Sequence, residues 1–234
     1  RCGLEVVDLV LQPLASSIAV LTEDEKELGV CLVDIGGGTT DIAVFTQGAI
    51  RHTAVIPVAG DQITSDIAHY LRTPTTEAEE IKVRHGVALQ QLADSDEMFE
   101  VPGIGERGPR PLSKTALADV IEPRVTELFE LVQSELRRSG YQELLSSGIV
   151  LTGGSSVMLG MIELGEEIFH MPVRLGIPKY AGGLSEVVQH PRYATAMGLL
   201  LEGMAQKKRG IQAHRTRTFR QVLGNMKSWF EKNF

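Results

Sequence analysis

The sequence predicts an α/β fold in which strands and helices alternate, and three observations support that class. Short apolar runs rich in β-branched residues, such as Cys31–Val33 and Ile42–Phe45, are typical of buried strands. Segments whose apolar residues have helical spacing lie between these runs. With 234 residues, of which 43% are hydrophobic, the chain can bury a sizeable core.

The first half of the chain is expected to hold three helices and a three-stranded segment. A Pro is welcome in the first turn of a helix, which favours a start at Gln12-Pro13. Thr75 and Thr76 can cap the third helix. Besides the two strands named above, the expected elements are a helix within Leu9–Leu21, an acidic linker at Thr22–Glu27, a strand at Ala49–Val58, and helices at Gly60–Leu71 and Glu77–Leu92.

The second half is expected to return to the sheet after a long helix. This helix is expected to be interrupted at Pro123 and stopped by Gly140. The expected elements are a strand at Met98–Val101, a loop at Pro102–Pro111, the helical stretch Ser113–Ser139, a strand at Gly148–Leu151, a helix at Leu159–Phe169, a strand at Val173–Leu175 and a helix at Pro191–Met204. The order of these elements indicates that residues of about 60 to 145 form an inserted subdomain.

Cysteine content and the termini limit the class further. Cys2 and Cys31 lie far apart and form no CxxC pattern, so we expect reduced, buried residues of a cytosolic protein and no cysteine metal site. No secretory signal and no apolar run approaching the ~20 residues of a membrane span is present in the sequence. The chain begins at Arg1 without Met, and we expect a further N-terminal portion.

Charge is divided unevenly along the chain, whose net charge is −7. Residues 205–234 carry eight Lys and Arg residues and the single acid Glu231, whereas residues 1–204 carry 15 Lys and Arg residues and 29 acids. An acidic body is not expected to bind nucleic acid, and a basic tail is expected to seek an anionic surface.

The most informative segment is Val30–Phe45, VCLVDIGGGTTDIAVF, a triple-glycine turn between two strands with Asp34 before it and Asp41 after it. Three glycines permit a sharp bend and leave its N–H groups uncovered, which suits an anionic phosphate. This is not a Walker loop, because no Lys-Ser/Thr follows and the second flank is a strand. An ordinary Gly-rich hairpin is the alternative, but acids flanking uncovered donors favour a metal–phosphate site.

Two further motifs have weaker signals of their own. Thr152-Gly153-Gly154 also follows an apolar strand, and a nucleotide could lie against its exposed backbone, although a simple strand–helix turn explains it equally well. Glu79 and Lys82 stand three apart on one helical face, where an acid can accept from ribose hydroxyls and a lysine can lie beside a base. Taken alone, that pair fits a solvated, salt-bridged face better.

These motifs carry a resemblance to known families. VDIGGGTTD, LTGG, AEEIK and the small-residue helix Ala194–Gly198 occur in the order seen in the actin/DnaK/sugar-kinase superfamily. Over essentially its whole length the chain resembles the C-terminal part of the FtsA family of bacterial cell-division proteins, through LASSIAVLTEDEKELGVCLVDIGGGTTDIAVF, EAEEIKVRHG, LADVIEPRVTEL, GIVLTGG and the tail.

The resemblance implies an actin-like (ribonuclease H-like) fold that binds ATP with Mg²⁺ between two lobes and assembles into filaments. It also implies tethering of the FtsZ ring to the cytoplasmic face of the inner membrane at the division septum, as a peripheral protein, and recruitment of later divisome proteins. The first phosphate loop and a small subdomain of the family would precede Arg1, so half of the nucleotide clamp is missing from this sequence, and we expect this chain alone to bind ATP poorly or not at all.

The resemblance also implies a division of the chain into domains. We expect a first part of the nucleotide-binding lobe at 1–59, the inserted α+β subdomain at 60–147, a second part of the lobe at 148–190, a helix returning to the first part at 191–204, a basic flexible linker at 205–217 and a C-terminal amphipathic helix at 218–234.

Site residues follow from the motif matches. The resemblance implies that Asp34 holds the hydration shell of Mg²⁺ and that Gln12 lies where actin relatives position the attacking water. An amide is no strong base, so we expect at most a slow Mg-dependent ATPase, and an ordinary helix-start polar residue is the alternative for Gln12. The implied nucleotide contacts are Gly36, Gly37, Gly38 and Thr39 with phosphate, Glu79 and Lys82 with ribose and adenine, and Gly153, Gly154 and Ser155 along the adenosine.

The tail gives independent evidence. Its large apolar residues fall on one helical stripe, namely Phe219, Val222, Leu223, Met226, Trp229, Phe230 and Phe234. A basic, amphipathic helix with Trp and Phe at its boundary is what binding to anionic lipid requires, and the polar, acid-free linker before it adds attraction. A terminal helix packed on the body or on a partner helix is the alternative.

The tail also separates three classes of function. By resemblance, Arg110, Lys114 and Arg124 in the inserted subdomain would meet acidic groups of the FtsZ C-terminal peptide, although scattered surface cations explain each of them as well. A metabolic kinase or phosphatase, or a chaperone ATPase, of the same superfamily is the alternative to a cell-division adaptor. Neither of those classes needs an amphipathic helix on a basic linker.

Overall fold

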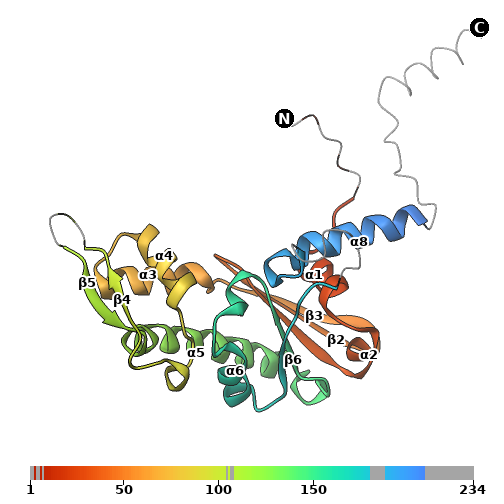
Figure 1. Cartoon of the computed structure of the whole chain (residues 1–234). Coiled ribbons are helices and arrows are strands. Elements are labelled where there is room, and N and C mark those ends of the chain that lie inside the picture. The colour runs from red at the N-terminus through yellow and green to blue at the C-terminus, as the bar shows by residue number, and fades with distance from the viewer. Residues whose placement is uncertain are drawn as a thin grey trace, which may run out of the picture.

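A five-stranded mixed sheet organises the larger part of the molecule in the computed structural model, which describes residues 8–103, 105, 108–179 and 188–208 together with Gly3 and Val6 (Figure 1). The strand order is β3-β2-β1-β6-β7, with β1–β2 and β2–β3 antiparallel and β1–β6 and β6–β7 parallel. The strands are β1 (Val30–Ile35), β2 (Thr40–Thr46), β3 (Ala49–Ile56), β6 (Ile149–Thr152) and β7 (Val173–Leu175). Every residue of β1 is buried, as expected for a central strand covered on both faces.

Helices cover both faces of this sheet (Figure 1). The first face packs against α1 (Gln12–Val20) and α8 (Ala194–Lys208), and the second against α5 (Lys114–Ser139) and α6 (Met161–Phe169). Because successive side chains of a strand point to opposite faces, Leu32 enters the first core and Val33 the second. Burying each such side chain contributes about 1.5–3 kcal/mol.

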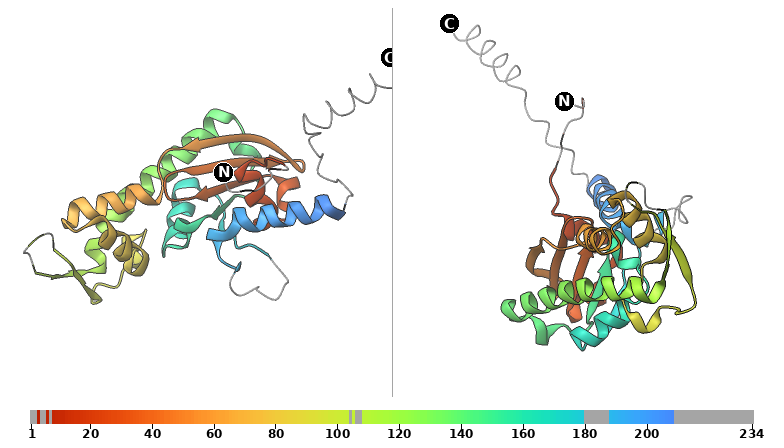
Figure 2. Two further views of the ribbon diagram at one scale, coloured as in Figure 1. Left: turned by 90° about the horizontal axis from the view of Figure 1, so that it is seen from above. Right: turned by 90° about the vertical axis from the view of Figure 1, so that its left-hand side faces the viewer.

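The remaining elements pack beyond one end of the sheet and are linked to it by α5 (Figure 2). They are α3 (Gly60–Leu71), α4 (Thr75–His85), the short 3₁₀ turn Gln90–Leu92, and a hairpin of β4 (Met98–Val101) and β5 (Arg110–Ser113). One continuous apolar core includes Ile63 of α3, Leu117 of α5 and Val33 of the sheet. The expected inserted subdomain thus shares its core with the sheet, and the boundaries given for it stay a prediction.

The expected acidic linker at Thr22–Glu27 is wrong, because a helix, α2 (Glu23–Leu28), begins there. The Thr22 hydroxyl accepts from the Glu25 N–H, and the Glu25 carboxylate accepts from the Thr22 N–H at 2.8 Å, a reciprocal cap that stabilises a short helix. Burial pushes the pKa of Glu25 upward, but hydrogen bonds from Arg174 of β7 and from Thr22 outweigh burial and lower it to about 2.

The helix expected at Glu77–Leu92 is shorter, since α4 begins at Thr75 after Pro74 and ends at His85. Thr75 and Thr76 therefore lie inside its first turn and make no cap. Gly86 is extended, with φ −62° and ψ 133°, and the next residue, Val87, forms a parallel bridge with Leu159. That tertiary pairing ends the helix where periodicity alone would continue it.

Proline explains two further differences. Pro111 lies in β5, inside the expected loop, and a two-stranded hairpin tolerates it because both strands have a free edge. Pro123 lies inside an uninterrupted α5, although an interior proline costs about 3 kcal/mol. The buried face of α5 offsets that cost by packing against both parts of the core. This face consists of Leu117, Ala118, Ile121, Val125, Leu128, Phe129, Val132 and Leu136.

The last described helix, α8, starts after the 3₁₀ turn Pro191–Tyr193 and extends to Lys208, so the expected linker is helical over its first four residues, 205–208. The other predicted strands and helices are confirmed within about two residues of their expected ends. Within the described part of the chain, no helix has both the length and the apolar character needed to cross a bilayer. The amphipathic segment at 218–234 lies outside the described residues.

The contact between α1 and α8 predicts a sharp difference between two glycines of α8. A Cβ on Gly198 would lie 1.7 Å from the Ala15 carbonyl oxygen, whereas a Cβ on Gly203 would meet nothing within 4 Å. We expect Gly198→Ala to lower the free energy of unfolding by about 1–3 kcal/mol in urea denaturation, because the two helices must separate. Gly203→Ala should raise it by about 0.5–1 kcal/mol. Equal effects of the two substitutions would show that the close packing contributes nothing.

Candidate functional site

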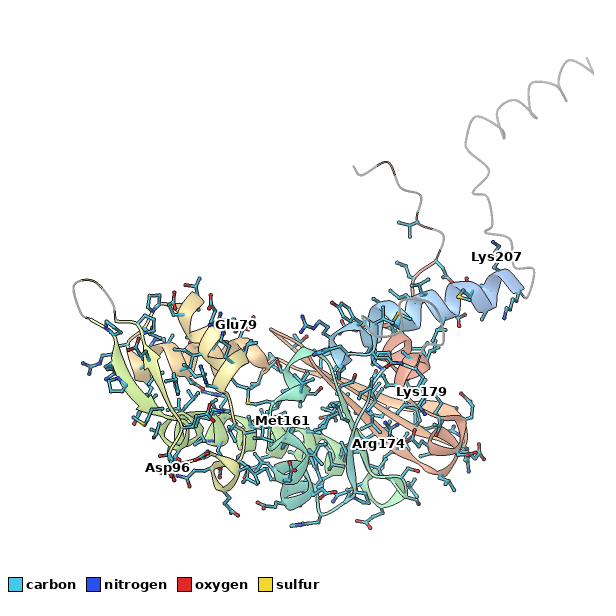
Figure 3. The ribbon with its side chains drawn as sticks, in the orientation of Figure 1. Glu79, Asp96, Met161, Arg174, Lys179 and Lys207 are labelled. Atoms are coloured by element: carbon cyan, nitrogen blue, oxygen red, sulfur yellow. The ribbon has the colours of Figure 1, made fainter. Side chains whose placement is uncertain are left out.

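A cavity of about 480 Å³ opens where the β1–β2 turn, the start of α3, one side of α4 and the turn after β6 meet. Glu79, on α4, marks its position in Figure 3. The residues that line it are Gly36, Gly37, Asp61, Glu79, Lys82, Val83, Gly86, Gly154, Ser155, Val157, Met158, Leu159 and Arg192. Six of the predicted nucleotide contacts therefore share one cavity, although they come from three distant stretches of sequence.

The triple-glycine turn is fixed through its carbonyl groups. The Gly36 carbonyl accepts from the Gly60 N–H at 3.1 Å and from the Ser155 hydroxyl at 2.9 Å, and the Gly37 carbonyl accepts from the Asp61 N–H at 2.7 Å. Among the described residues, the N–H groups of Gly37 and Gly38 have no backbone partner, and both glycines are exposed. Uncovered N–H groups on a rigid turn form a concave set of donors for an anion.

Asp34 is buried beside this turn, and its Oδ2 accepts a hydrogen bond from the Ser16 hydroxyl at 2.6 Å. Burial raises its pKa, opposed by the hydrogen bond from Ser16 and by the nearby Gln12 amide and Thr195 hydroxyl. Asp41 lies opposite it in the β1–β2 register, and burial together with the Asp34 charge raises the pKa of Asp41 as well. A bound cation would relieve the repulsion between these two carboxylates.

The donor set fits Mg²⁺ held largely through water. Carboxylate oxygens are the ligands that Mg²⁺ prefers, and this ion usually keeps several waters and binds one or two carboxylates plus substrate phosphates. Asp34 and Asp41 supply two such carboxylates. Across residues 8–103, 108–179 and 188–208, no group of three or more His, Cys, Asp or Glu side chains could hold a metal by itself.

Lys82 lines the cavity, but its ammonium group is hydrogen-bonded to other groups of the protein. Its ammonium group donates to the Gly60 carbonyl at 3.0 Å, to the Thr64 hydroxyl at 2.8 Å and to the Glu79 carboxylate at 2.7 Å. An ammonium group has three N–H donors, so all of them are used. Burial raises the pKa of Glu79, but hydrogen bonds from Lys82 and Thr64 outweigh burial and lower it overall.

The turn after β6 packs directly on the end of β1. Gly153 has a φ of +89°, and a Cβ there would lie 2.4 Å from the Ile35 carbonyl oxygen, so only glycine fits. Gly154 and Ser155 follow on the cavity wall. Four of the predicted residues do not line the cavity, although each is within two positions of a residue that does. They are Asp34, Gly38, Thr39 and Gly153. Gln12 is exposed at the start of α1, near Asp34 and off the cavity wall.

Sequence reasoning missed three parts of the cavity. Asp61 follows Gly60 at the start of α3, and an acid at a predicted helix start beside the glycine turn was a usable signal. The apolar wall includes Val83 and Val157, which are exposed by 72% and 45%. Unpaired valines on a polar helical segment hint at such a wall. Arg192 had no signal, because only the fold brings its segment beside Gly154.

The predicted partner residues do not form one group. Arg110 donates to the Leu71 carbonyl at 2.7 Å beside a second cavity of about 420 Å³, lined also by Tyr70 and Arg72. Lys114 pairs with Glu97 at 2.6 Å, and Arg124 pairs with Asp66 and Glu127. Two of the three cations are therefore already neutralised within the chain. The predicted membrane-binding residues lie outside the described part.

Comparison with known proteins gives the family. The family model of the cell division protein FtsA matches residues 31–198. The chain belongs to the FtsA family. It is 59% identical to the FtsA of Pseudomonas aeruginosa and 48% identical to that of Escherichia coli K12, in each case over 100% of this chain and 58% of the relative. The chain thus spans a little over half the length of these FtsA relatives.

Solved structures confirm the predicted actin-like fold. MreB5 of Spiroplasma citri bound to ADP superposes with a TM-score of 0.69 at 21% identity, over 88% of this chain and 63% of that one. A MamK double helical filament gives a TM-score of 0.61 at 17% identity, over 82% of this chain and 58% of that one. At such identities the likeness concerns the fold alone.

The Lys82 contacts predict that removal of the ammonium group lowers the stability of this chain by an amount that depends on pH. Lys82→Met should cost about 1–2 kcal/mol of unfolding free energy at pH 7, since it removes a buried donor from three acceptors. The pKa of Glu79 in the folded chain lies below its usual value of 4.5. The stabilisation that the Glu79–Lys82 pair gives is therefore fully present above pH 4.5, and it is lost as the pH falls through the pKa of the folded chain. Urea titrations at pH 7 and pH 3 should therefore show a smaller difference between the two proteins at pH 3.

Arg84→Met is the matched control, because Arg84 pairs with Glu80 on the same helix and is 70% exposed. It should cost no more than about 0.5 kcal/mol. A Lys82→Met effect that stays equal at both pH values would contradict the assigned role of Glu79.

Proposed function

We propose that this chain is the nucleotide-binding and membrane-docking part of an actin-like cell-division protein that binds Mg–ATP in the 480 Å³ cavity. The observation that carries the proposal is the glycine turn, whose carbonyls are held by α3 and Ser155 while the Gly37 and Gly38 N–H groups stay uncovered. Those donors suit phosphate oxygens. The ADP and AMPPNP named for MreB5 structures of the same fold support the choice of nucleotide.

The cavity wall suggests how the rest of the nucleotide would lie. Val83, Val157 and Leu159 offer an apolar slot of the kind that a planar base needs. The Glu79 carboxylate, half exposed at the wall, would accept from ribose hydroxyls. Lys82 orients Glu79 and the start of α3 instead of contacting the base itself, which refines the role predicted for it.

Asp34 and Asp41 would hold Mg²⁺ through water, and the ion would neutralise charge on the phosphates. Gln12, exposed near Asp34, is our candidate for orienting a water molecule by its amide group. Because an amide takes up no proton, hydrolysis would be slow. Turnover of this kind suits a nucleotide that controls assembly better than a metabolic kinase or phosphatase.

The cellular role that we propose is tethering of the FtsZ ring to the cytoplasmic face of the inner membrane at the septum, with recruitment of later divisome proteins. Membership of the FtsA family supports it. Self-association into filaments is supported by the MamK double helical filament, a structure of the same fold. For the FtsZ C-terminal peptide, Arg110 beside the second cavity is a better candidate than the ion-paired Lys114 and Arg124.

Charge reversal at Arg192 tests the nucleotide site. Arg192 lines the cavity, and among the described residues it forms no ion pair with a carboxylate. Arg192→Glu should therefore weaken Mg–ATP binding by at least about tenfold in calorimetry, because a carboxylate would face an anionic ligand. Lys207→Glu makes the same charge change at the far end of α8 and should leave binding unaltered (Figure 3). Equal affinities of the two variants would argue against this cavity as the site.

Removal of the tail tests membrane docking. The intact chain should co-sediment with vesicles that contain anionic lipid, and a chain ending at Arg217 should not, because it lacks the apolar stripe of residues 219–234. Neutral vesicles of the same size are the control for the basic charge, and they should bind less of the intact chain. If both chains sediment equally with anionic vesicles, the tail is not the lipid-binding segment.

A further inference from the structure

A pair of hydroxyl groups joins the buried Asp34 to the helix that closes the described fold. The Ser16 hydroxyl of α1 lies 2.6 Å from Asp34 Oδ2, and the Thr195 hydroxyl of α8 lies 2.9 Å from the Ser16 hydroxyl. Ser16 is fully buried and Thr195 is half-buried. Ser16 and Thr195 are 179 positions apart, and α1 and α8 lie side by side in Figure 1. Only the folded chain brings these two groups together.

The carboxylate sets the direction of both hydrogen bonds. An ionised carboxylate only accepts, so Ser16 must donate its single proton to Asp34. The Ser16 oxygen can then only accept from Thr195, whose hydroxyl donates. Donors in such a chain polarise one another, so Thr195 strengthens the bond that Ser16 makes to the carboxylate.

The neighbouring serine shows that local structure does not explain this arrangement. Ser17 is also buried, but its hydroxyl donates at 2.8 Å to the Leu14 carbonyl of its own helix, a common way for a helical serine to satisfy itself. Ser16 instead donates across to the sheet. Because the Ser16 hydroxyl bonds a carboxylate instead of a carbonyl of its own helix, its role concerns that carboxylate.

The space around the pair is tightly bounded. Gly198, one turn after Thr195, packs its Cα against the Ala15 backbone, and a Cβ on Gly153 would lie 2.6 Å from Asp34 Oδ1. The helix α8 therefore cannot approach closer, and the carboxylate cannot swing toward Gly153. Hydroxyl groups held in this way fix both the distance and the orientation of the Asp34 carboxylate.

We propose that Thr195, acting through Ser16, is a positioning residue of the nucleotide site, which orients the Asp34 carboxylate for a hydrated divalent cation. The proposal rests on the proposed function for the identity of the ligand, but the orientation of Asp34 does not depend on that ligand. Outer hydrogen bonds to a metal-binding carboxylate typically change metal affinity by about 10- to 100-fold when they are removed.

The test compares Ser16→Ala, Thr195→Val and Thr195→Ser with the unaltered full chain. Two quantities are measured, the ¹³C chemical shift of the Asp34 carboxyl at pH 7 without nucleotide, and the Mg²⁺-dependent affinity for ATP. Because removal of a donor changes the polarisation of the carboxylate, Ser16→Ala and Thr195→Val should move this chemical shift. The same two variants should weaken Mg–ATP binding on the order of tenfold. Thr195→Ser, which keeps the hydroxyl, should restore both values.

Ser17→Ala is the matched control, since it removes a buried hydroxyl from the same helix without touching Asp34. It should leave both quantities unchanged. Asp41, which faces Asp34 from β2, is retained in every variant. Thermal melts of all variants show whether any shift follows a general loss of fold.

An unchanged Asp34 chemical shift in both Ser16→Ala and Thr195→Val would overturn the proposal. It would also fail if Thr195→Ser behaved like Thr195→Val, because packing rather than the hydroxyl would then matter. If the chemical shift moves as expected but the unaltered chain binds no Mg–ATP, the positioning of Asp34 stands and the proposed nucleotide function fails.

Discussion

The hydrogen bonds from α3 and Ser155 to the carbonyls of the glycine turn are the interaction on which the site depends. A three-glycine turn without outside contacts would sample many conformations, because glycine loses more backbone entropy than any other residue on folding. Here Gly60 and Ser155 both hold the Gly36 carbonyl, and Asp61 holds the Gly37 carbonyl. The peptide groups are thereby oriented, and the N–H groups of the turn point away from those partners. A flexible sequence becomes a fixed set of donors through contacts made by distant segments.

The sheet and most helices were predictable because their sequence signals are local and agree with one another. The two strands flanking the glycine turn are short apolar runs rich in β-branched residues, and α3 and α6 have clear helical periodicity. The failures occurred where a tertiary contact outweighs a local rule. α5 continues through Pro123 because its buried face packs on two parts of the core, and α4 ends at His85 because Val87 bridges to Leu159.

The candidate site was predictable in its motifs and not in its electrostatics. Gly36, Gly37, Glu79 and Ser155 line one cavity, as their motifs suggested. The sequence does not reveal that Lys82 spends its three donors on Gly60, Thr64 and Glu79, since that requires the distance between α3 and α4. It does not reveal Arg192 either, because the contact with Gly154 exists only after α8 returns to the sheet.

The packing of α8 on α1 constrains how the residues around Asp34 can move. The first turn of α8 carries Thr195, whose hydroxyl is hydrogen-bonded to Ser16 of α1. Because Gly198 packs against the Ala15 backbone, α8 cannot slide toward α1 without a steric clash. A rearrangement at Asp34 that displaces Thr195 would therefore require α8 to move together with α1. The start of α1 carries Gln12, so such a movement would displace Gln12 and Thr195 together. Under the proposed function, the residues around Asp34 would then respond to nucleotide as one helix pair rather than one by one.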